Sequence, residues 1–147
     1  MKHFFALLFI PLLTLSQCGD NNTTSAHREP HYEEVEDLHI EWDDLFSQNN
    51  DKYYVYFYGI GCGYCSALRE DMTSLARSGK ETIYFMYPSD DVQFTDNLSI
   101  AVNSLGATSI EDVYLYSTPT LMKIKNKTIT EYIREYNTIR DFIDSYN

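Results

Sequence analysis

Hydrophobic and polar positions divide this chain of 147 residues into three stretches. Residues 4–13 are almost wholly apolar, follow the cation Lys2, and are too few to cross a bilayer as a helix. This combination predicts a signal peptide over residues 1–17. Residues 18–32 are polar and without periodicity, which predicts a flexible tether. Regular hydrophobic spacing occupies residues 33–147, a length that suits one compact domain.

A strand, a helix and a second strand form the centre of the predicted domain. Residues 53–58 are an unbroken apolar run, which is typical of a strand covered on both faces. Apolar residues then recur at helical spacing as far as Ser78-Gly79, at Leu68, Met72, Leu75 and Ala76. Residues 82–87 resume a strand pattern, closed by Pro88. This order predicts a βαβ unit in which the two strands lie parallel.

Shorter elements are predicted on either side of this unit. Before it, residues 35–40 are predicted as a short strand and residues 42–46 as a short helix. Residues 110–116 match neither period clearly. The remaining predicted elements follow the unit: a helix over 98–105, strands over 121–124 and 128–133 that pair as a hairpin, and a closing helix over 139–146.

Two cysteines lie where the central strand passes into the helix, in the sequence Gly61-Cys62-Gly63-Tyr64-Cys65. Unpaired backbone N–H groups and the macrodipole at a helix N-terminus favour negative charge, so the thiolate of Cys62 is stabilised there. Two intervening residues bring Cys65 within one helical turn. A disulfide between the two can therefore close and reopen with little backbone movement. We expect a redox-active disulfide that needs no further cofactor.

Charge and histidine spacing argue against several other functions. The chain has 22 acidic and 11 basic residues, a net charge of −11, which argues against nucleic acid and against an anionic lipid surface as partners. His27, His31 and His39 have no recognised ligand spacing, and they are predicted to be solvated rather than to bind metal. A structural zinc site on Cys62 and Cys65 would need a second Cys or His pair, which the predicted domain lacks. The 13 tyrosines are interpreted as core residues of the sheet.

The third cysteine, Cys18, follows the apolar segment directly. The sequence Leu15-Ser16-Gln17-Cys18 resembles a bacterial lipobox, in which the cysteine becomes the lipidated first residue of the mature chain. Gln17 stands where a small residue is usual, so cleavage by a conventional signal peptidase nearby is the alternative. We expect an extracytoplasmic protein attached to a bacterial membrane through a lipid on Cys18. The alternative is a secreted or periplasmic soluble protein.

The order of elements resembles the thioredoxin superfamily over residues 33–147. The shared features are a strand, a Cys-x-x-Cys motif opening a helix, a further strand and helix, Thr118-Pro119-Thr120 entering a β-hairpin, and a final amphipathic helix. The resemblance implies an α/β thioredoxin-like fold, with a central mixed β-sheet flanked by helices. It places the Cys-x-x-Cys motif at the N-terminus of the first core helix.

The resemblance also implies roles for individual residues. Cys62 would be the attacking thiolate that forms a mixed disulfide, and Cys65 the resolving thiol that releases the product. Pro119 would follow a cis peptide bond beside the disulfide and leave the Thr118 backbone free to pair with an extended substrate. Tyr64, in the place of the proline of the thioredoxin motif, and Gly63 complete the expected substrate-binding residues.

Two further positions depart from the thioredoxin pattern. Tyr56 stands in the central strand where thioredoxins keep a buried acid, and Gly61 stands where they have a tryptophan. Proton transfer to Cys65 is therefore expected to run through water or through the Tyr56 hydroxyl. The Cys-Gly-Tyr-Cys sequence, with threonine before the proline, is similar to that of bacterial periplasmic disulfide isomerases. This similarity favours a less reducing centre than that of thioredoxin.

These features predict a protein thiol–disulfide oxidoreductase whose substrates are exported proteins with thiols or disulfides. It would need a membrane or soluble redox partner, and the sequence leaves open whether electrons flow in the reductase or the isomerase direction. The alternative is a redox-inactive module of the same fold that binds a secretion or surface partner, because the fold alone does not confer activity.

Overall fold

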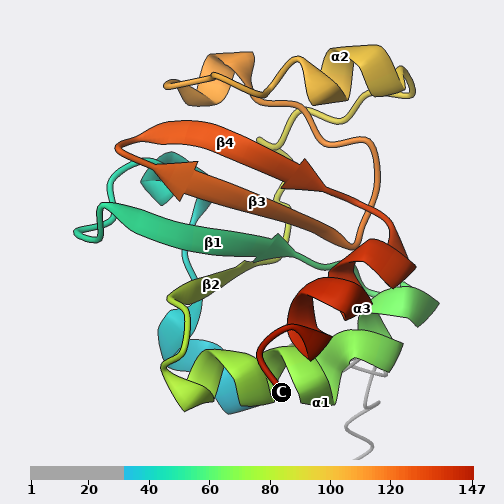
Figure 1. Ribbon diagram of the computed structural model, residues 1–147. Helices are drawn as coiled ribbons and strands as arrows, with labels where there is room; N and C mark the ends of the chain where they lie inside the picture. The colour runs from blue at the N-terminus through green and yellow to red at the C-terminus, as the bar shows by residue number, and fades with distance from the viewer. Residues whose placement is uncertain (1–31) are drawn as a thin grey trace, which may run out of the picture.

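The computed structural model describes residues 32–147, which form a mixed β-sheet of four strands with helices on both faces (Figure 1). The strands stand in the order β2-β1-β3-β4, and they are β1 (Lys52–Phe57), β2 (Ile83–Met86), β3 (Thr120–Lys125) and β4 (Thr128–Ile133). β1 runs parallel to β2 and antiparallel to β3, and β3 pairs antiparallel with β4. The predicted βαβ unit and hairpin are confirmed. The predicted signal peptide and Cys18 lie outside the described residues.

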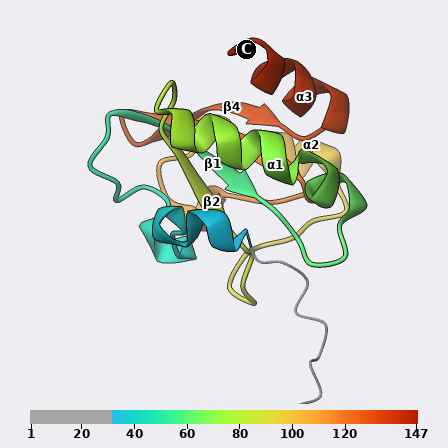
Figure 2. The same cartoon turned by 90° about the horizontal axis from the view of Figure 1, so that it is seen from below.

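The helices form two layers with the sheet between them. α1 (Gly63–Ser78) and α3 (Tyr136–Asp144) cover one face, and α2 (Leu98–Val102) lies over the other (Figures 1 and 2). Side chains of β1 alternate between the two hydrophobic clusters that result: Tyr54 and Tyr56 pack with α1 and α3, whereas Tyr53, Val55 and Phe57 pack on the α2 side. Because β1 has a strand on each edge and a core on each face, its unbroken apolar sequence is explained.

α1 fixes the position of the cysteines relative to the sheet. It begins after Cys62, its N-cap residue, and ends before Gly79, whose φ of 70° is the left-handed conformation that favours glycine. The apolar stripe predicted from the sequence is the face that meets the sheet, because Leu68, Met72 and Leu75 are buried there. Each such side chain stabilises the docked helix by about 1.5–3 kcal/mol.

The turn of the C-terminal hairpin has two residues, Asn126 and Lys127, with φ of 49° and 59°. Two successive left-handed residues match the twist of the strands that they join, and asparagine tolerates this conformation better than most residues. The turn is further held by the Asn126 N–H, which donates to the Asp51 carbonyl oxygen at 2.7 Å. The sequence predicted the position of this turn but made it one residue too long, because Lys125 is still paired with Thr128 as the last residue of β3.

The strand predicted over residues 35–40 is wrong. The chain forms instead a 3-10 helix, η1 (Glu33–Leu38). The element is kinked at Val35, whose φ of −130° is not helical, and the kink lets both Val35 and Leu38 pack on the core. Only His39 pairs with the sheet in this segment, through a single parallel bridge to Phe85.

The other short elements differ from the predictions in their bounds. The expected helix near residue 42 is the 3-10 helix η2 (Trp42–Asp44), and residues 110–116 contain the 3-10 helix η3 (Ile110–Asp112). α2 ends at Val102, before the predicted residue 105. Gly106 then has a φ of 88°, and its N–H donates to the Ile129 carbonyl oxygen at 2.8 Å, so the chain turns onto β4 there. Between residues 32 and 147, no helix is long and apolar enough to cross a membrane.

Candidate functional site

A short loop connects β1 to the two cysteines. Tyr58 follows the strand and is still buried, and Gly59-Ile60-Gly61 then leads to Cys62. Gly61 has a φ of 75°, a conformation that favours glycine over the tryptophan of the thioredoxin pattern. The loop places Cys62 at the N-terminus of α1, as the sequence predicted.

Cys62 and Cys65 form a disulfide with an S–S distance of 2.09 Å and a Cα–Cα distance of 5.2 Å. The two sulfurs differ in their access to solvent. Cys65 is 1% exposed and belongs to the core between α1 and the sheet, whereas Cys62 is half-buried. An incoming thiolate or disulfide can therefore reach Cys62 and not Cys65.

Two backbone groups lie next to the Cys62 sulfur. The Cys65 N–H donates to Cys62 Sγ at 3.1 Å, which directs a partial positive charge at the atom that would carry the thiolate. The Thr118 carbonyl oxygen lies 3.5 Å from the same sulfur. The peptide bond between Thr118 and Pro119 is cis, which confirms the expectation from the resemblance.

Thr118 also lies against the loop after β1. A Cβ placed on Gly59 would come within 2.7 Å of Thr118 Oγ1, so glycine is required for the close approach of these two segments. This contact holds the loop before Pro119 next to the disulfide.

A groove of about 490 Å³ runs beside the disulfide on the Pro119 side. Its lining residues are Tyr64, Ser117, Thr118, Pro119, Arg134, Glu135, Tyr136 and Asn137. Three of the predicted substrate-binding residues, Thr118, Pro119 and Tyr64, therefore line one groove, and Gly63 lies exposed at the start of α1. The Tyr64 ring is 64% exposed and lies 5.2 Å from the ring of Tyr136.

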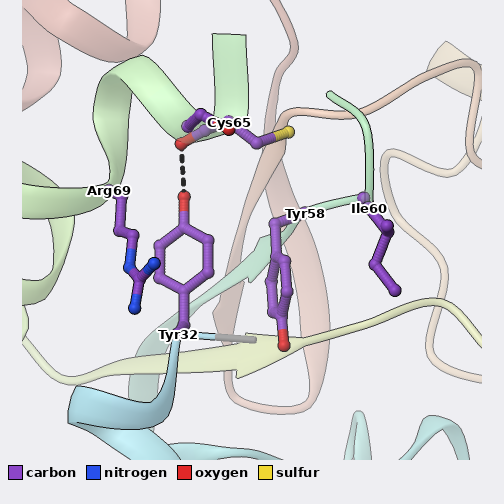
Figure 3. A pocket seen from close by; sticks show the side chains of 7 residues that line it. Tyr32, Tyr58, Ile60, Cys65 and Arg69 are labelled. Atoms are coloured by element: carbon purple, nitrogen blue, oxygen red, sulfur yellow. Dashed lines mark hydrogen bonds between the residues drawn. The ribbon is translucent and has the colours of Figure 1, made fainter. Parts of the chain in front are cut away.

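Two tyrosines lie behind Cys65, and one of them is Tyr56, which the sequence analysis placed where the thioredoxin pattern has a buried acid. Tyr56 is fully buried and belongs to the same core cluster as Cys65, so its side chain points inward. The Tyr32 hydroxyl donates to the Cys65 carbonyl oxygen at 2.6 Å, as Figure 3 shows. Because this bond uses the Tyr32 hydrogen, the Tyr56 hydroxyl, 3.3 Å away, is the donor toward Tyr32.

Burial keeps these phenols neutral. Desolvation raises the pKa of Tyr32 to about 12, and it also raises that of Tyr56 above the ordinary value. Burial raises the pKa of Tyr58, which lies beside them, to about 12. At neutral pH all three side chains can donate hydrogen bonds but cannot take up a proton from a thiol.

His39 is not the solvated side chain that the sequence predicted. It is partly buried, and its Nδ1–H donates to the Val35 carbonyl oxygen at 3.1 Å. Nε2 of the neutral ring then accepts from the Tyr58 hydroxyl at 2.8 Å. His39 therefore orients Tyr58 from the side remote from the disulfide. His27 and His31 lie outside the described residues.

Sequence reasoning missed Tyr32, Tyr58 and Arg69. Together with Gly59, Ile60, Cys65 and Ser66, these three residues line a cavity of about 130 Å³ behind the disulfide (Figure 3). Tyr32 was assigned to the tether, yet it is only 2% exposed and belongs to the core. The only signal was its own aromatic ring, three residues before Val35, the first apolar residue of η1. Within residues 32–147, no three His, Cys, Asp or Glu side chains gather as a metal site would require.

No family model matches the chain, and no curated protein sequence matches it. Among solved structures, thioredoxin f2 of Chlamydomonas reinhardtii is similar with a TM-score of 0.50 and 14% identity, over 75% of this chain and 95% of that one. Mitochondrial thioredoxin 3 of Saccharomyces cerevisiae has a TM-score of 0.43 and 20% identity, over 74% and 91% of the two chains.

The similarity to the algal thioredoxin concerns the fold, since the sequence identity is low. The four-stranded mixed sheet with helices on both faces is the part of the structure that this similarity concerns. The chain therefore has a thioredoxin-like fold with a Cys-x-x-Cys disulfide at the start of α1, an arrangement that supports thiol–disulfide oxidoreductase chemistry in general.

Proposed function

We propose that this protein exchanges disulfides with exported proteins through Cys62 and Cys65. The observation that carries the proposal is the unequal access to the two sulfurs: Cys62 is half-buried at a helix N-terminus, and Cys65 is covered by the core. A pair of this kind has one sulfur for the partner and one sulfur for the intramolecular step. A disulfide with a structural role only would have no need for this asymmetry.

The reaction runs in two displacements. In the reduced protein the Cys62 thiolate attacks one sulfur of a substrate disulfide, and the other substrate sulfur leaves with the bonding electron pair. Cys65 then loses its proton and attacks Cys62 Sγ. The bond between Cys62 and the substrate breaks, so the substrate is reduced to two thiols and the protein is oxidised to the disulfide. The reverse sequence oxidises a substrate dithiol.

The groove beside the disulfide is the proposed substrate site. An extended segment around the substrate cysteine would lie along Thr118 and Pro119, where backbone groups are available for pairing. The exposed ring of Tyr64 provides an apolar surface at one side, and Arg134 provides a cation at the other. Specificity would then depend on the residues that flank the substrate cysteine.

The reduction potential of the Cys62–Cys65 pair tests this function. The full chain with Cys18→Ser would be equilibrated with thiol–disulfide buffers of known ratio, so that only the pair responds. A potential near about −270 mV would indicate a reductase, and one between about −180 and −120 mV an isomerase or oxidase. Cys62→Ser, which should abolish the two-electron couple, is the matched control. The absence of a reversible couple in the parent chain would refute the proposal and favour a redox-inactive binding module.

We also infer that the protein acts outside the cytoplasm on a lipid anchor at Cys18. The support comes from the sequence: the cation and apolar run of a signal peptide, followed by the lipobox-like Leu15-Ser16-Gln17-Cys18. Mass spectrometry of the membrane fraction should find a diacylated Cys18 as the first residue. Cys18→Ala should lose the lipid and move to the soluble fraction. An unmodified first residue elsewhere would favour a secreted or periplasmic soluble protein.

A redox partner is required for turnover. A reductase must receive electrons from a membrane or soluble donor, and an oxidase must pass them to an acceptor. Cys65→Ser should trap this partner as a mixed disulfide on Cys62, and peptide mass spectrometry of the trapped species would identify it.

A further inference from the structure

The second displacement requires that Cys65 lose a proton, and between residues 32 and 147 no carboxylate or imidazole belongs to the cluster or the cavity around it. The hydrophobic cluster that contains Cys65 is formed by η1 and the residue before it, by β1, α1, β2, β3, β4 and α3, and β2 and β4 bring only the apolar Ile83, Phe85 and Ile133 to it. The titratable or charged side chains that these elements bring to the cluster or to the adjacent cavity are Tyr32, Tyr54, Tyr56, Tyr58, Cys62, Arg69, Tyr136 and Tyr146. β3 contributes the apolar Leu121.

Among the described residues, the nearest groups that could accept a proton at neutral pH are already engaged. Glu34 accepts from Arg69 at 2.8 Å and is exposed on the surface. His39 Nε2 accepts the Tyr58 hydroxyl, and Figure 3 shows that hydroxyl at the end of the ring remote from the Cys65 sulfur. Neither group points at the thiol.

The cavity behind the disulfide offers a different route. Its volume of about 130 Å³ has room for several water molecules, and its walls include both the buried Cys65 and the exposed side chains of Ile60 and Ser66. Water in this cavity would therefore connect the Cys65 thiol to solvent. The Tyr32 hydroxyl faces the same region, but it donates its hydrogen to the Cys65 carbonyl oxygen and not to the thiol.

We propose that Tyr32 and Tyr56 hold Cys65 in place as neutral hydrogen-bond donors, and that the thiol proton of Cys65 passes to solvent water through this cavity. The inference rests on the proposed function. The balanced step is removal of the proton by hydroxide from solvent, followed by attack of the Cys65 thiolate on Cys62 Sγ and departure of the substrate sulfur with its electron pair. Tyr32 and Tyr56 are positioning residues, since neither touches a reacting sulfur.

The test is the pH profile of the second displacement. Reduced full chain with Cys18→Ser would be mixed rapidly with an excess of a symmetrical aromatic disulfide whose released thiolate absorbs visible light. The first release reports attack by Cys62 and depends on reagent concentration, whereas the second reports attack by Cys65 and does not. We expect the second rate to rise about tenfold per pH unit between about pH 5.5 and 7.5, without a plateau.

Variants separate positioning from proton transfer. Tyr32→Phe should slow the second release by about fivefold at every pH and leave the first unchanged, because it removes one hydrogen bond to Cys65. Tyr56→Phe and His39→Gln should keep the tenfold slope. Tyr56→Asp places a carboxylate behind Cys65 and should flatten the slope above the pH at which that carboxyl titrates; if this variant does not fold, the other profiles still decide.

Two results would overturn the inference. One is a plateau in the parent profile that Tyr56→Phe or His39→Gln abolishes, which would make that residue the base. The other is an equal slowing of both releases by Tyr32→Phe. Failure of the proposed function gives a different result, since a chain without a reversible two-electron couple in the buffer titration would show no second release at any pH.

Discussion

Gly59→Ala tests the contact that holds the loop before Pro119 against the disulfide. The added Cβ would lie 2.7 Å from Thr118 Oγ1, several tenths of an ångström inside ordinary van der Waals contact. Thr118 must move or adopt another rotamer, so we expect the free energy of unfolding to fall by about 1–2 kcal/mol, within the usual range for overpacking. Because the Thr118 carbonyl lies 3.5 Å from Cys62 Sγ, the displacement should also slow reduction of a protein disulfide by about tenfold.

Removing the obstructing oxygen should restore stability. In a Thr118→Ala background, the nearest atoms to the new Cβ would be the Cβ atoms of Cys62 and residue 118, each at 3.7 Å. Gly59→Ala should then cost less than about 0.5 kcal/mol, since the alanine also restricts the unfolded chain. Urea unfolding of the oxidised chain can be followed by the fluorescence of Trp42, the single tryptophan, which is buried. An equal cost of Gly59→Ala in both backgrounds would refute the steric explanation.

Three further predictions concern the turn, the tyrosines and the resolving thiol. Lys127→Gly should raise the free energy of unfolding by about 0.5–1 kcal/mol, because Lys127 has a φ of 59°; a lower urea midpoint would contradict this. Since burial raises the pKa of Tyr32 to about 12, the unfolded chain loses this proton first above pH 10, so this one group should lower stability by about 1.4 kcal/mol per pH unit between pH 10 and 12, in addition to the share of the other buried tyrosines. Tyr32→Phe should remove that share of the slope in urea unfolding at successive pH values, and an unchanged slope would argue against the assignment. Cys65→Ser should accumulate a substrate-linked form by mass spectrometry, whereas Cys62→Ser should not.

The elements that the sequence predicted correctly are those in which one local pattern decides the structure. The apolar run before the cysteines has no polar face, so only a central strand can accommodate it. The stripe of α1 and the position of the hairpin turn at Asn126 and Lys127 are equally local, although the turn is one residue shorter than predicted. The pattern of residues 35–40 was too short to separate a strand from a 3-10 turn, and packing on the sheet decided in favour of η1.

The candidate site was predictable in part for the same reason. The cysteine pair is contiguous in the sequence, and the residues around Pro119 followed from the resemblance. Tyr32 and His39, in contrast, act through distant contacts. Tyr32 bonds to Cys65, 33 positions further along the chain, and His39 bonds to Tyr58, 19 positions further along, and the sequence next to them does not indicate either contact. Tyr32 was assigned to the tether because the residues before it are polar and without periodicity, and His39 was assigned to solvent because its spacing matches no metal-ligand pattern.

Tyr32 is the first residue that the structure describes, and it also lies directly behind the disulfide. The preceding chain therefore enters the domain at a residue whose hydroxyl donates to the Cys65 carbonyl oxygen. The centroid of its ring lies 4.4 Å from that of Tyr58. Mechanical tension along the preceding segment would therefore be felt first behind the redox-active pair rather than at a remote surface. For the same reason, a chain trimmed to start at residue 33 would keep both cysteines and still lose the hydroxyl that supports one of them.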